Sequence, residues 1–265
     1  MGGLDMTPVD YSLLDRPEIS ANSFYPRPYW TETPEGAEDL SVTVEEGVAL
    51  SCRFFPVGQS RPTILFFYGN GETAAGYDDI APFYNRIGAN FFISDYRGYG
   101  ASGGTPTFSA MLSDAHQVLE SVKRELLQTD GFTGPIYVMG RSLGRHAAFE
   151  LAAEFPDEIN GAIIESGRPS LGQFIRGLEP STARDLQAAY QDKVCSISIP
   201  VLVIHGQMDA SAPIQDAVGM YQNFSSPDKH LIIIPGAGHN DLMHIGFGQY
   251  FGAIRGFVNK YANVG

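Results

Sequence analysis

The chain has 265 residues, of which 43% are hydrophobic and 18% are charged, and this is enough for one large α/β domain with a buried core. Its 30 acidic and 17 basic residues give a formal net charge of -13, which excludes nucleic acid and anionic membrane surfaces as expected partners. The two cysteines, Cys52 and Cys195, fit neither a disulfide framework nor the spacing of zinc ligands.

The hydropathy pattern gives no sign of a membrane protein. No stretch approaches the roughly 18 consecutive apolar residues of a membrane span. The first residues also lack a basic segment followed by an apolar core. We therefore expect a soluble, cytoplasmic protein without integral membrane contact, and the sequence leaves its oligomeric state open.

Residues 1–38 form a segment rich in prolines and turn formers, with the run Tyr25-Pro26-Arg27-Pro28-Tyr29-Trp30 near its centre. Because prolines disfavour a regular helix, we expect an extended segment whose aromatic side chains pack on the core. A loose tail and packing on a partner chain are the alternatives.

Residues 39–265 are predicted to form a single domain. Residues 40–44 and 48–55 have strand patterns separated by Glu45-Glu46-Gly47, which predicts an antiparallel hairpin. Short, continuous apolar runs then alternate with helical stretches, the clearest over 108–127. Such runs are typical of strands covered on both faces, so we predict a mostly parallel, twisted sheet with helices on both faces. These runs are residues 63–68, 90–94, 136–139, 162–164, 201–204 and 231–234.

A serine lies between a predicted strand and a predicted helix. The sequence Gly140-Arg141-Ser142-Leu143-Gly144 directly follows the apolar run 136–139 and precedes a helical stretch. This pattern is typical of a nucleophile elbow, a sharp turn that lifts the serine hydroxyl clear of the sheet. A hydroxyl also needs a base to take its proton before it becomes a good nucleophile.

The loops that follow other strands supply the partners that this serine needs. The carboxyl ends of parallel strands meet at one edge of a sheet, where sites of this fold class lie. Asp209 and His239 follow two of these strands. The three residues occur in the chain in the order Ser142, Asp209, His239, which is the order expected of a catalytic triad in a fold with a nucleophile elbow. His239 is predicted to act as general base, and Asp209 to orient it. The backbone N–H groups of Asn70 and Leu143 are predicted to hold the oxyanion, and no metal or cofactor is required.

Each site residue also has a structural interpretation. Ser142 could be a plain turn residue, and His239 a histidine of a surface loop. Asp209 could cap the helix that Pro213 begins, in which case Glu165 is the replacement acid.

Other polar residues are predicted to be structural. His146 shares a helical face with Glu150 and Glu154, which predicts a solvated or salt-bridged stripe pointing away from Ser142. His205 is predicted to shape its turn. The glycine-rich loop 95–104 is predicted to be scaffolding.

Five motifs together resemble the α/β-hydrolase superfamily over residues 63–257, and most closely its BEM46-like serine hydrolases. They are FFYGNGE, DYRGYGASGG, GRSLG, HGQMD and GAGHND. The resemblance implies an α/β-hydrolase fold, places the catalytic roles on Ser142, Asp209 and His239, and puts the amides of Asn70 and Leu143 at the oxyanion. Members of the family include carboxylesterases and thioesterases that act on acyl esters or protein S-acyl groups.

Two positions depart from the family pattern. Tyr68 stands where the family usually has histidine before the oxyanion glycine, and it is a possible substrate-binding residue. Arg145 stands where small residues usually follow the elbow. Because the helix dipole disfavours a cation in the first turn, we expect an anionic partner for Arg145, either a protein carboxylate or a substrate carboxylate at the pocket mouth.

A small lid is predicted over residues 168–199. Residues 171–178 and 183–194 could each form a short helix, with Phe174 available to line an acyl pocket.

These features predict a serine hydrolase that cleaves an acyl ester or thioester through an acyl-enzyme intermediate, with a small molecule as substrate. A catalytically silent protein that keeps the fold for binding is the first alternative. A peptidase or lactonase on the same fold is the second.

Overall fold

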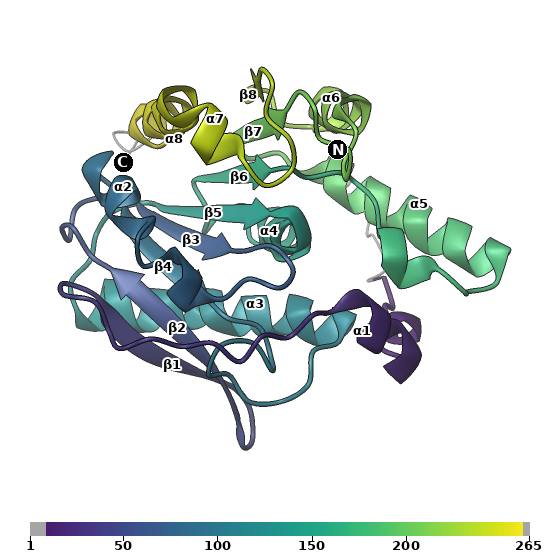
Figure 1. Ribbon diagram of the computed structural model, residues 1–265, viewed down its shortest axis with the longest axis horizontal. Coiled ribbons are helices and arrows are strands. Elements are labelled where there is room, and N and C mark those ends of the chain that lie inside the picture. Colours follow the sequence, from purple (N-terminus) through teal and green to yellow (C-terminus); the bar gives the residue numbers. More distant parts are fainter. Residues whose placement is uncertain (1–8, 262–265) are drawn as a thin grey trace.

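The computed structural model describes residues 9–261, apart from the side chains at 127–129 and 261, so the ends of the predicted N-terminal segment and domain lie outside the described residues. The described chain forms an eight-stranded sheet with helices around it (Figure 1). The strand order is β1-β2-β4-β3-β5-β6-β7-β8. The strands are β1 Glu38–Glu45, β2 Val48–Phe55, β3 Thr63–Phe67, β4 Asn90–Ser94, β5 Ile136–Arg141, β6 Gly161–Glu165, β7 Val201–Gly206 and β8 Lys229–Ile234.

The sheet is antiparallel at one edge and parallel elsewhere. β1 and β2 form the predicted hairpin, and β2 pairs antiparallel with β4. From β4 to β8 every neighbouring pair is parallel. All residues of β3 to β7 are buried, as their continuous apolar runs predicted. The predicted fold class is confirmed.

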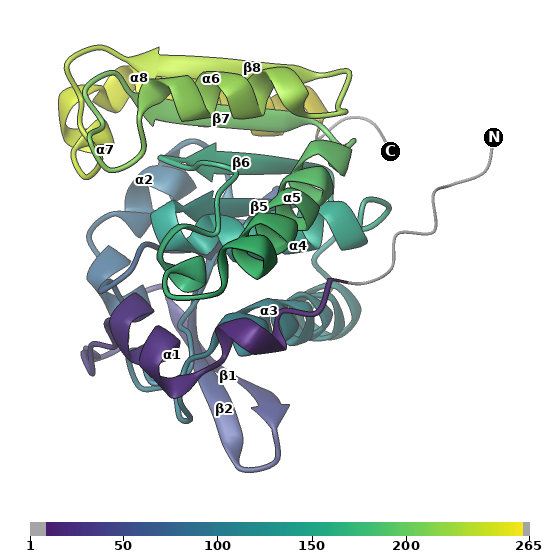
Figure 2. The ribbon, with the colours of Figure 1, turned by 90° about the vertical axis from the view of Figure 1, so that its right-hand side faces the viewer.

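Helices cover both faces of the sheet (Figures 1 and 2). One face carries α3, α4, α5 and α6, and the other carries α2 and α8. The predicted apolar stripe of α3 is buried, but the helix ends at Val122 and continues as a π-helical stretch, η3. The helices are η1 Ser12–Leu14, α1 Pro17–Ser23, η2 Ala74–Tyr77, α2 Ala81–Arg86, α3 Phe108–Val122, η3 Lys123–Thr129, η4 Ser142–Gly144, α4 Arg145–Glu154, η5 Gly172–Ile175, α5 Pro180–Ser196, α6 Ile214–Asn223, α7 Leu242–Ile245 and α8 Phe247–Tyr261.

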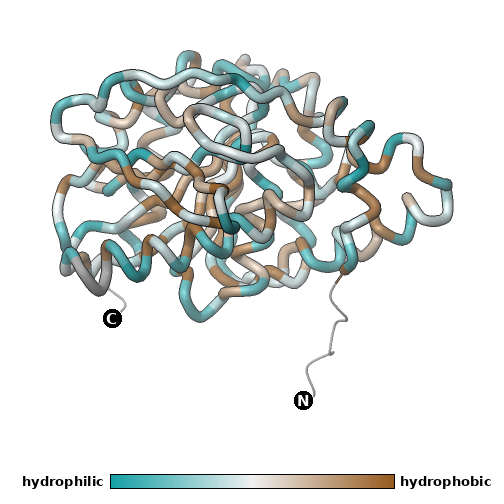
Figure 3. The backbone as a smooth tube through the Cα atoms, turned by 90° about the horizontal axis from the view of Figure 1, so that it is seen from below, coloured by the Kyte–Doolittle hydropathy of each residue, from teal (hydrophilic) through white to brown (hydrophobic). Residues whose placement is uncertain are grey.

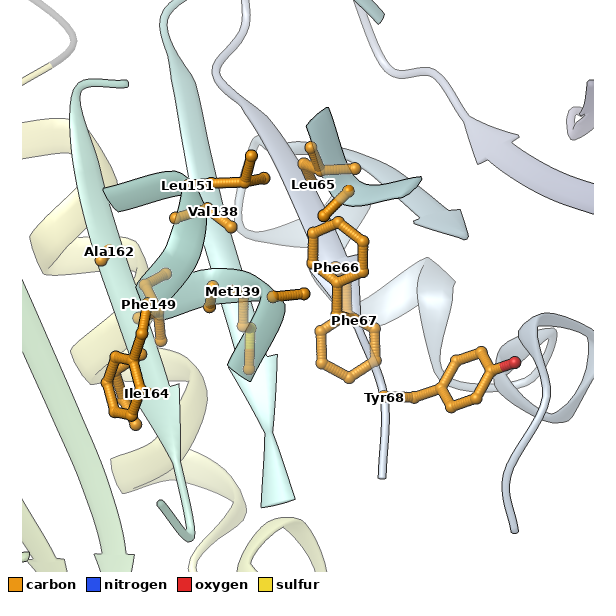
Figure 4. Close-up of a cluster of buried hydrophobic side chains, with 14 of the residues drawn as sticks. Leu65, Phe66, Phe67, Tyr68, Val138, Met139, Phe149, Leu151, Ala162 and Ile164 are labelled. Carbon is orange, nitrogen blue, oxygen red and sulfur yellow. The ribbon is translucent and has the colours of Figure 1, made fainter. Parts of the chain in front are cut away.

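The core occupies both faces of the sheet, and one layer of it lies between the central strands and α4. Hydrophobic segments run through the middle of the molecule, while hydrophilic ones are common on its outer turns (Figure 3). Phe149 and Leu151 of α4 lie over the strands that carry Val138 and Ile164 (Figure 4). Because burying one such side chain stabilises the fold by about 1.5 to 3 kcal/mol, this layer fixes the helix that follows Ser142.

The described part of the N-terminal segment contains a helix, which the sequence analysis did not expect. Pro17 occupies the first turn of α1, where a missing N–H costs nothing, so this proline begins the helix. Phe24 packs on Phe174 with ring centroids 5.3 Å apart, and Tyr11 packs on Phe108 at 5.1 Å. The segment therefore contacts both η5 and α3 of its own chain.

The predicted lid region contains two helices of unequal length. η5 is a single 3-10 turn, shorter than the helix expected over 171–178, whereas α5 is longer than the helix expected over 183–194. Within the described residues, no helix is both long enough and apolar enough to cross a membrane.

Candidate active site

Ser142 lies in a strained turn at the end of β5. Its φ of 49° is in the left-handed region, which costs a non-glycine residue about 1 to 3 kcal/mol and recurs at functional sites. A Cβ at Gly140 would lie 2.6 Å from the carbonyl oxygen of Gly144, and one at Gly144 would lie 2.0 Å from that of Phe67. The flanking glycines therefore let the strand and the helix approach closely enough to form the elbow.

The structure brings Ser142, His239 and Asp209 into hydrogen-bond contact. His239 Nε2 lies 2.8 Å from Ser142 Oγ, and His239 Nδ1 lies 2.7 Å from Asp209 Oδ2. The three side chains come from the ends of β5, β8 and β7. This is the relay geometry in which an imidazole can take the serine proton while a carboxylate stabilises the resulting cation.

The carboxylate of Asp209 is buried and held on both oxygens. Oδ1 accepts hydrogen bonds from the backbone N–H groups of Ser211 and Ala212, at 2.9 and 2.8 Å, and leaves Oδ2 for His239. Burial alone would raise the pKa of Asp209, but the hydrogen bonds from His239 and Ala212 lower it below its usual value. Asp209 is therefore ionised at neutral pH, as an orienting carboxylate must be.

Asn70 and Leu143 line the same cavity as Ser142 and His239, and its volume is about 350 Å³. The side chain of Asn70 is tied to the N-terminal segment, because Oδ1 accepts from Tyr25 N at 2.9 Å and Nδ2 donates to Ser23 O at 2.8 Å. Tyr99 Oη donates to the same Oδ1 at 2.6 Å. These bonds fix the loop that carries the Asn70 amide beside the serine.

A buried ionic network lies beneath the site and was not predicted from the sequence. Arg141 contacts the carboxylates of Glu72 and Glu165 and donates to Asn240 Oδ1 at 2.8 Å. Its Nη2 also donates to the carbonyl oxygen of His239 at 3.3 Å. One guanidinium thus links the loop that carries Glu72, the end of β5 and the loop that carries His239. Arg141 and Glu72 stand inside the GRSLG and FFYGNGE motifs, but their spacing in the chain gives no sign that they pair.

Comparison with known proteins identifies the family. Protein bem46 of Schizosaccharomyces pombe is 30% identical over 208 residues, which cover 76% of this chain and 68% of that protein. The chain belongs to the α/β-hydrolase superfamily and is BEM46-like. Residues 58–173 of this BEM46-like protein match the family described as serine aminopeptidase, S33. The human alpha/beta hydrolase domain-containing protein 17B is 28% identical over 241 residues, covering 88% of the chain and 78% of that protein.

Solved structures agree with the fold of this BEM46-like chain. The Pyrococcus furiosus esterase Pf2001 superposes with a TM-score of 0.73 at 20% identity, and the superposition covers 91% of this chain and 100% of the esterase. Est1E from Butyrivibrio proteoclasticus with bound ferulic acid gives a TM-score of 0.68 at 20% identity, and the superposition covers 84% of this chain and 98% of Est1E. At these identities the likeness establishes the fold alone.

Tyr68, the first departure from the BEM46-like pattern, does not reach the cavity. Its side chain is fully buried, and its hydroxyl donates to Asp95 Oδ1 at 2.5 Å. The prediction that Tyr68 is a possible substrate-binding residue is therefore corrected, because its ring packs among Tyr77, Tyr96 and Tyr99 and not against the cavity. Burial raises the pKa of Asp95 to about 6, although Tyr68 and the Ala74 amide lower it in part.

Arg145, the second departure, has no carboxylate partner among the described residues. It is 7% exposed, and it donates to the carbonyl oxygens of Ser142 at 2.6 Å, Arg168 at 2.9 Å and Ser170 at 2.7 Å. Burial lowers its pKa to about 10, so it is still charged at neutral pH. The expected anionic protein partner is replaced by carbonyl dipoles.

Phe174 does not line an acyl pocket. It is fully buried between Phe24, Phe108 and His146. The cavity is lined instead by Gln173 of η5 and by Arg176, which directly follows η5. Residues three apart in a 3-10 turn lie on the same side, so Gln173 and the end of the turn face the cavity while Phe174 turns into the core.

The stripe of His146, Glu150 and Glu154, predicted to be solvated or salt-bridged, is salt-bridged at its two glutamates, which both pair with Lys193. For His146 itself neither alternative holds. His146 is 1% exposed, and its Nδ1 lies 2.6 Å from the hydroxyl of Tyr190 in α5. Glu150, on the same face, is buried too and pairs with His116 and Lys193 from two other helices. At His146 and Glu150 the face is polar because it packs between helices, whereas Glu154 at its end is exposed to water.

Two further polar residues are buried beside the site. Glu165 does not contact the imidazole of His239. Its carboxylate accepts hydrogen bonds from Arg141 and from Tyr250 Oη, the latter at 2.7 Å, so it is not placed as a replacement acid. His205 Nε2 lies 2.7 Å from the carbonyl oxygen of Ala212, across the loop that holds Asp209.

Proposed function

We propose that this α/β-hydrolase is a serine hydrolase that cleaves an acyl ester or thioester through an acyl-enzyme intermediate. The proposal rests on the continuous contact from Ser142 Oγ through His239 to Asp209, with both hydrogen bonds between 2.7 and 2.8 Å. A base at this distance can take the serine proton without further movement. The family membership and the esterases among the structural neighbours support the reaction class.

Acylation follows from the roles of the three side chains. His239 Nε2 takes the proton from Ser142 Oγ as the oxygen attacks the acyl carbonyl carbon. Asp209 keeps Nδ1 protonated and stabilises the imidazolium. The imidazolium then protonates the departing alcohol or thiol, and water repeats the sequence to release the acid.

The negative charge of the tetrahedral intermediate needs preorganised donors. The backbone N–H groups of Asn70 and Leu143 are proposed to supply them, because both residues border the cavity beside Ser142. Losing one such donor typically costs about 10² to 10³ in rate. The buried guanidinium of Arg145 adds a positive field at the same place.

A fluorophosphonate probe and chromogenic esters test the proposal. The wild type should be labelled and should hydrolyse 4-nitrophenyl acetate and an acyl thioester with a burst of product. Ser142→Ala should lose both activities while it keeps the wild-type circular dichroism spectrum. A folded wild type that is neither labelled nor active would favour the silent binding protein.

A peptidase is the second candidate, because the matching family is described as serine aminopeptidase, S33. An aminopeptidase must hold the ammonium group of a peptide, for which a carboxylate is the usual partner. The cavity wall instead carries Arg145, Arg168 and Arg176, which would repel that group. Hydrolysis of alanine 4-nitroanilide at a rate comparable to that of the esters would reverse this preference.

A further inference from the structure

The cavity beside Ser142 is cationic in a protein whose formal net charge is -13. Arg145, Arg168 and Arg176 all line it. Among the residues that the structure describes, no acidic side chain lines the same wall. The remaining lining is mostly polar, with Asn22 and Gln173 among it, so the cavity differs from the apolar acyl pocket that the sequence suggested.

In the part of the chain that the structure describes, no carboxylate neutralises the three guanidinium groups. There, the hydrogen bonds of Arg145 all go to carbonyl oxygens. Within residues 9–261, the guanidinium groups of Arg168 and Arg176 form neither an ion pair nor a hydrogen bond. Arg145 is buried and Arg168 is partly buried, while Arg176 is exposed at the rim of the cavity. A buried or partly buried charge without an opposite charge is costly, and the cost is recovered when a ligand supplies that charge.

The backbone holds these charges at the cavity in a defined way. Arg145 Nε and Nη2 donate hydrogen bonds to the carbonyl oxygens of Arg168 and Ser170. The first residues of the lid region are therefore anchored to α4, the helix that follows Ser142. Gln173 in the single turn of η5 and Arg176 directly after it then line the cavity. Arg168 and Arg176 therefore reach the cavity from one short segment that Arg145 fixes.

We infer that the substrate of this site carries an anionic oxygen group, a carboxylate or a phosphate, in addition to the bond that is cleaved. The inference rests on the proposed serine hydrolase function, because it assigns a substrate class to that same site. Arg168 and Arg176 bind the anion, since a guanidinium offers a planar pair of donors that matches the two oxygens of such a group. The volume of about 350 Å³ suits a small acidic ester.

Matched pairs of esters test this inference. Mono-4-nitrophenyl adipate is compared with the 4-nitrophenyl ester of adipamic acid, which replaces the carboxylate by a neutral amide of the same shape. The pair 4-acetoxybenzoate and 4-acetoxybenzamide places the charge on the alcohol side instead. We expect kcat/KM to be higher for the acid in at least one pair, by roughly tenfold, the low end for a hydrogen bond to a charged group. Competitive inhibition by inorganic phosphate would identify a phosphate site.

Variants separate a local effect from the overall charge. Arg176→Gln and Arg168→Gln should each lower the ratio of acid to amide kcat/KM several-fold. Arg184→Gln is the control, because this exposed arginine of α5 lies outside the cavity and its loss changes the net charge equally. Added salt should weaken the preference, since exposed charges are screened over about 8 to 10 Å.

Binding to Ser142→Ala keeps the test independent of catalysis. Calorimetry should show tighter binding of the adipate ester than of the adipamate ester to this inactive variant. Equal kcat/KM and equal binding within both pairs, without inhibition by phosphate, would overturn the inference while leaving the hydrolase proposal intact. A preference that survives in both Arg168→Gln and Arg176→Gln would also overturn it. An unlabelled, inactive wild type would refute the hydrolase, and the binding comparison would then decide the anion site alone.

Discussion

Replacing Arg141 with methionine should destabilise the protein by about 3 to 5 kcal/mol at pH 7.5, the usual cost of leaving one partner of a buried ion pair uncompensated. Arg141 is 5% exposed and Glu165 is 2% exposed, and Arg141 Nε lies 3.2 Å from Glu165 Oε1. Without the guanidinium, Tyr250 Oη is the partner that Glu165 retains. The loss should therefore exceed that of an ordinary surface ion pair several-fold.

The size of this loss should depend on pH. Burial raises the pKa of Glu165 in the native protein, and the nearby charge of Arg141 opposes that rise. In Arg141→Met the pKa should rise further. When folding raises the pKa of an acid, the folded protein binds more protons than the unfolded chain. The free energy of unfolding of the protein therefore falls as pH rises through the folded pKa, by at most about 1.4 kcal/mol per pH unit. The defect should be smaller at pH 5.5 than at pH 7.5.

A double-mutant cycle by urea unfolding measures the coupling. The four proteins are the wild type, Arg141→Met, Glu165→Gln and the double variant. Because the double variant removes both charges, it should recover at least about 1 kcal/mol relative to the sum of the single changes. Effects that add within about 0.5 kcal/mol at both pH values would refute the ion-pair reasoning.

Activity gives a separate measurement of the same residue. Arg141 also holds the backbone of His239 and the side chain of Asn240, so its loss should lower kcat by about 10²-fold, the size expected for a displacement near 1 Å. Arg141→Lys should regain much of the stability by restoring the charge. It should not restore kcat, because lysine lacks the fork that joins the loops. Full kcat in Arg141→Met would show that this residue does not position the site.

Three further changes test other parts of the structure. Asp209→Asn should reduce kcat about 10⁴-fold in an ester assay, because an amide can donate to His239 and select the wrong tautomer; a fall below tenfold would contradict the role of Asp209. His146 is buried and neutral, and burial holds its pKa well below the usual value, so the unfolded chain binds the extra proton and stability falls as pH drops below about 6.5. Below that pH, urea titrations should show that the wild type loses unfolding free energy relative to His146→Gln by about 1.4 kcal/mol per pH unit. A difference between the two proteins that does not change with pH would disprove this role of His146. Phe24→Ala should cost about 3 to 5 kcal/mol in the same unfolding assay, because the ring is 3% exposed; no measurable change would show that the N-terminal segment is not docked in solution.

The sheet and the elbow could be predicted because their sequence signals are local. A strand buried on both faces is apolar throughout, and a sharp turn beside a helix needs glycines. The faces of the helices could not be assigned in this way. His146 and Glu150 lie on a polar stripe, and a stripe that meets Tyr190 and Lys193 of α5 has the same spacing as one that meets water. Only the packing of α5 on α4 distinguishes the two.

The lid shows a second limit of sequence reasoning. Whether Phe174 faces the cavity depends on the rotation of a single 3-10 turn, and a shift of one residue would bring it to the cavity side. A hydrophobic side chain in a lid suggests an acyl pocket, but Phe24 and Phe108 already occupy the space around Phe174. The side left for the cavity is therefore the charged one.

The charge of Arg145 connects these observations. A cation in the first turn of α4 lies at the positive end of the helix dipole, so the sequence predicted a compensating anion. The protein supplies the carbonyl oxygens of Ser142, Arg168 and Ser170, which satisfy the hydrogen bonds of the guanidinium but leave its net charge. In the proposed hydrolase, that charge would favour the negative charge that develops beside Ser142 in the tetrahedral intermediate. Arg145 would thus assist catalysis and hold the segment from which Arg168 and Arg176 bind the anionic group of the inferred substrate.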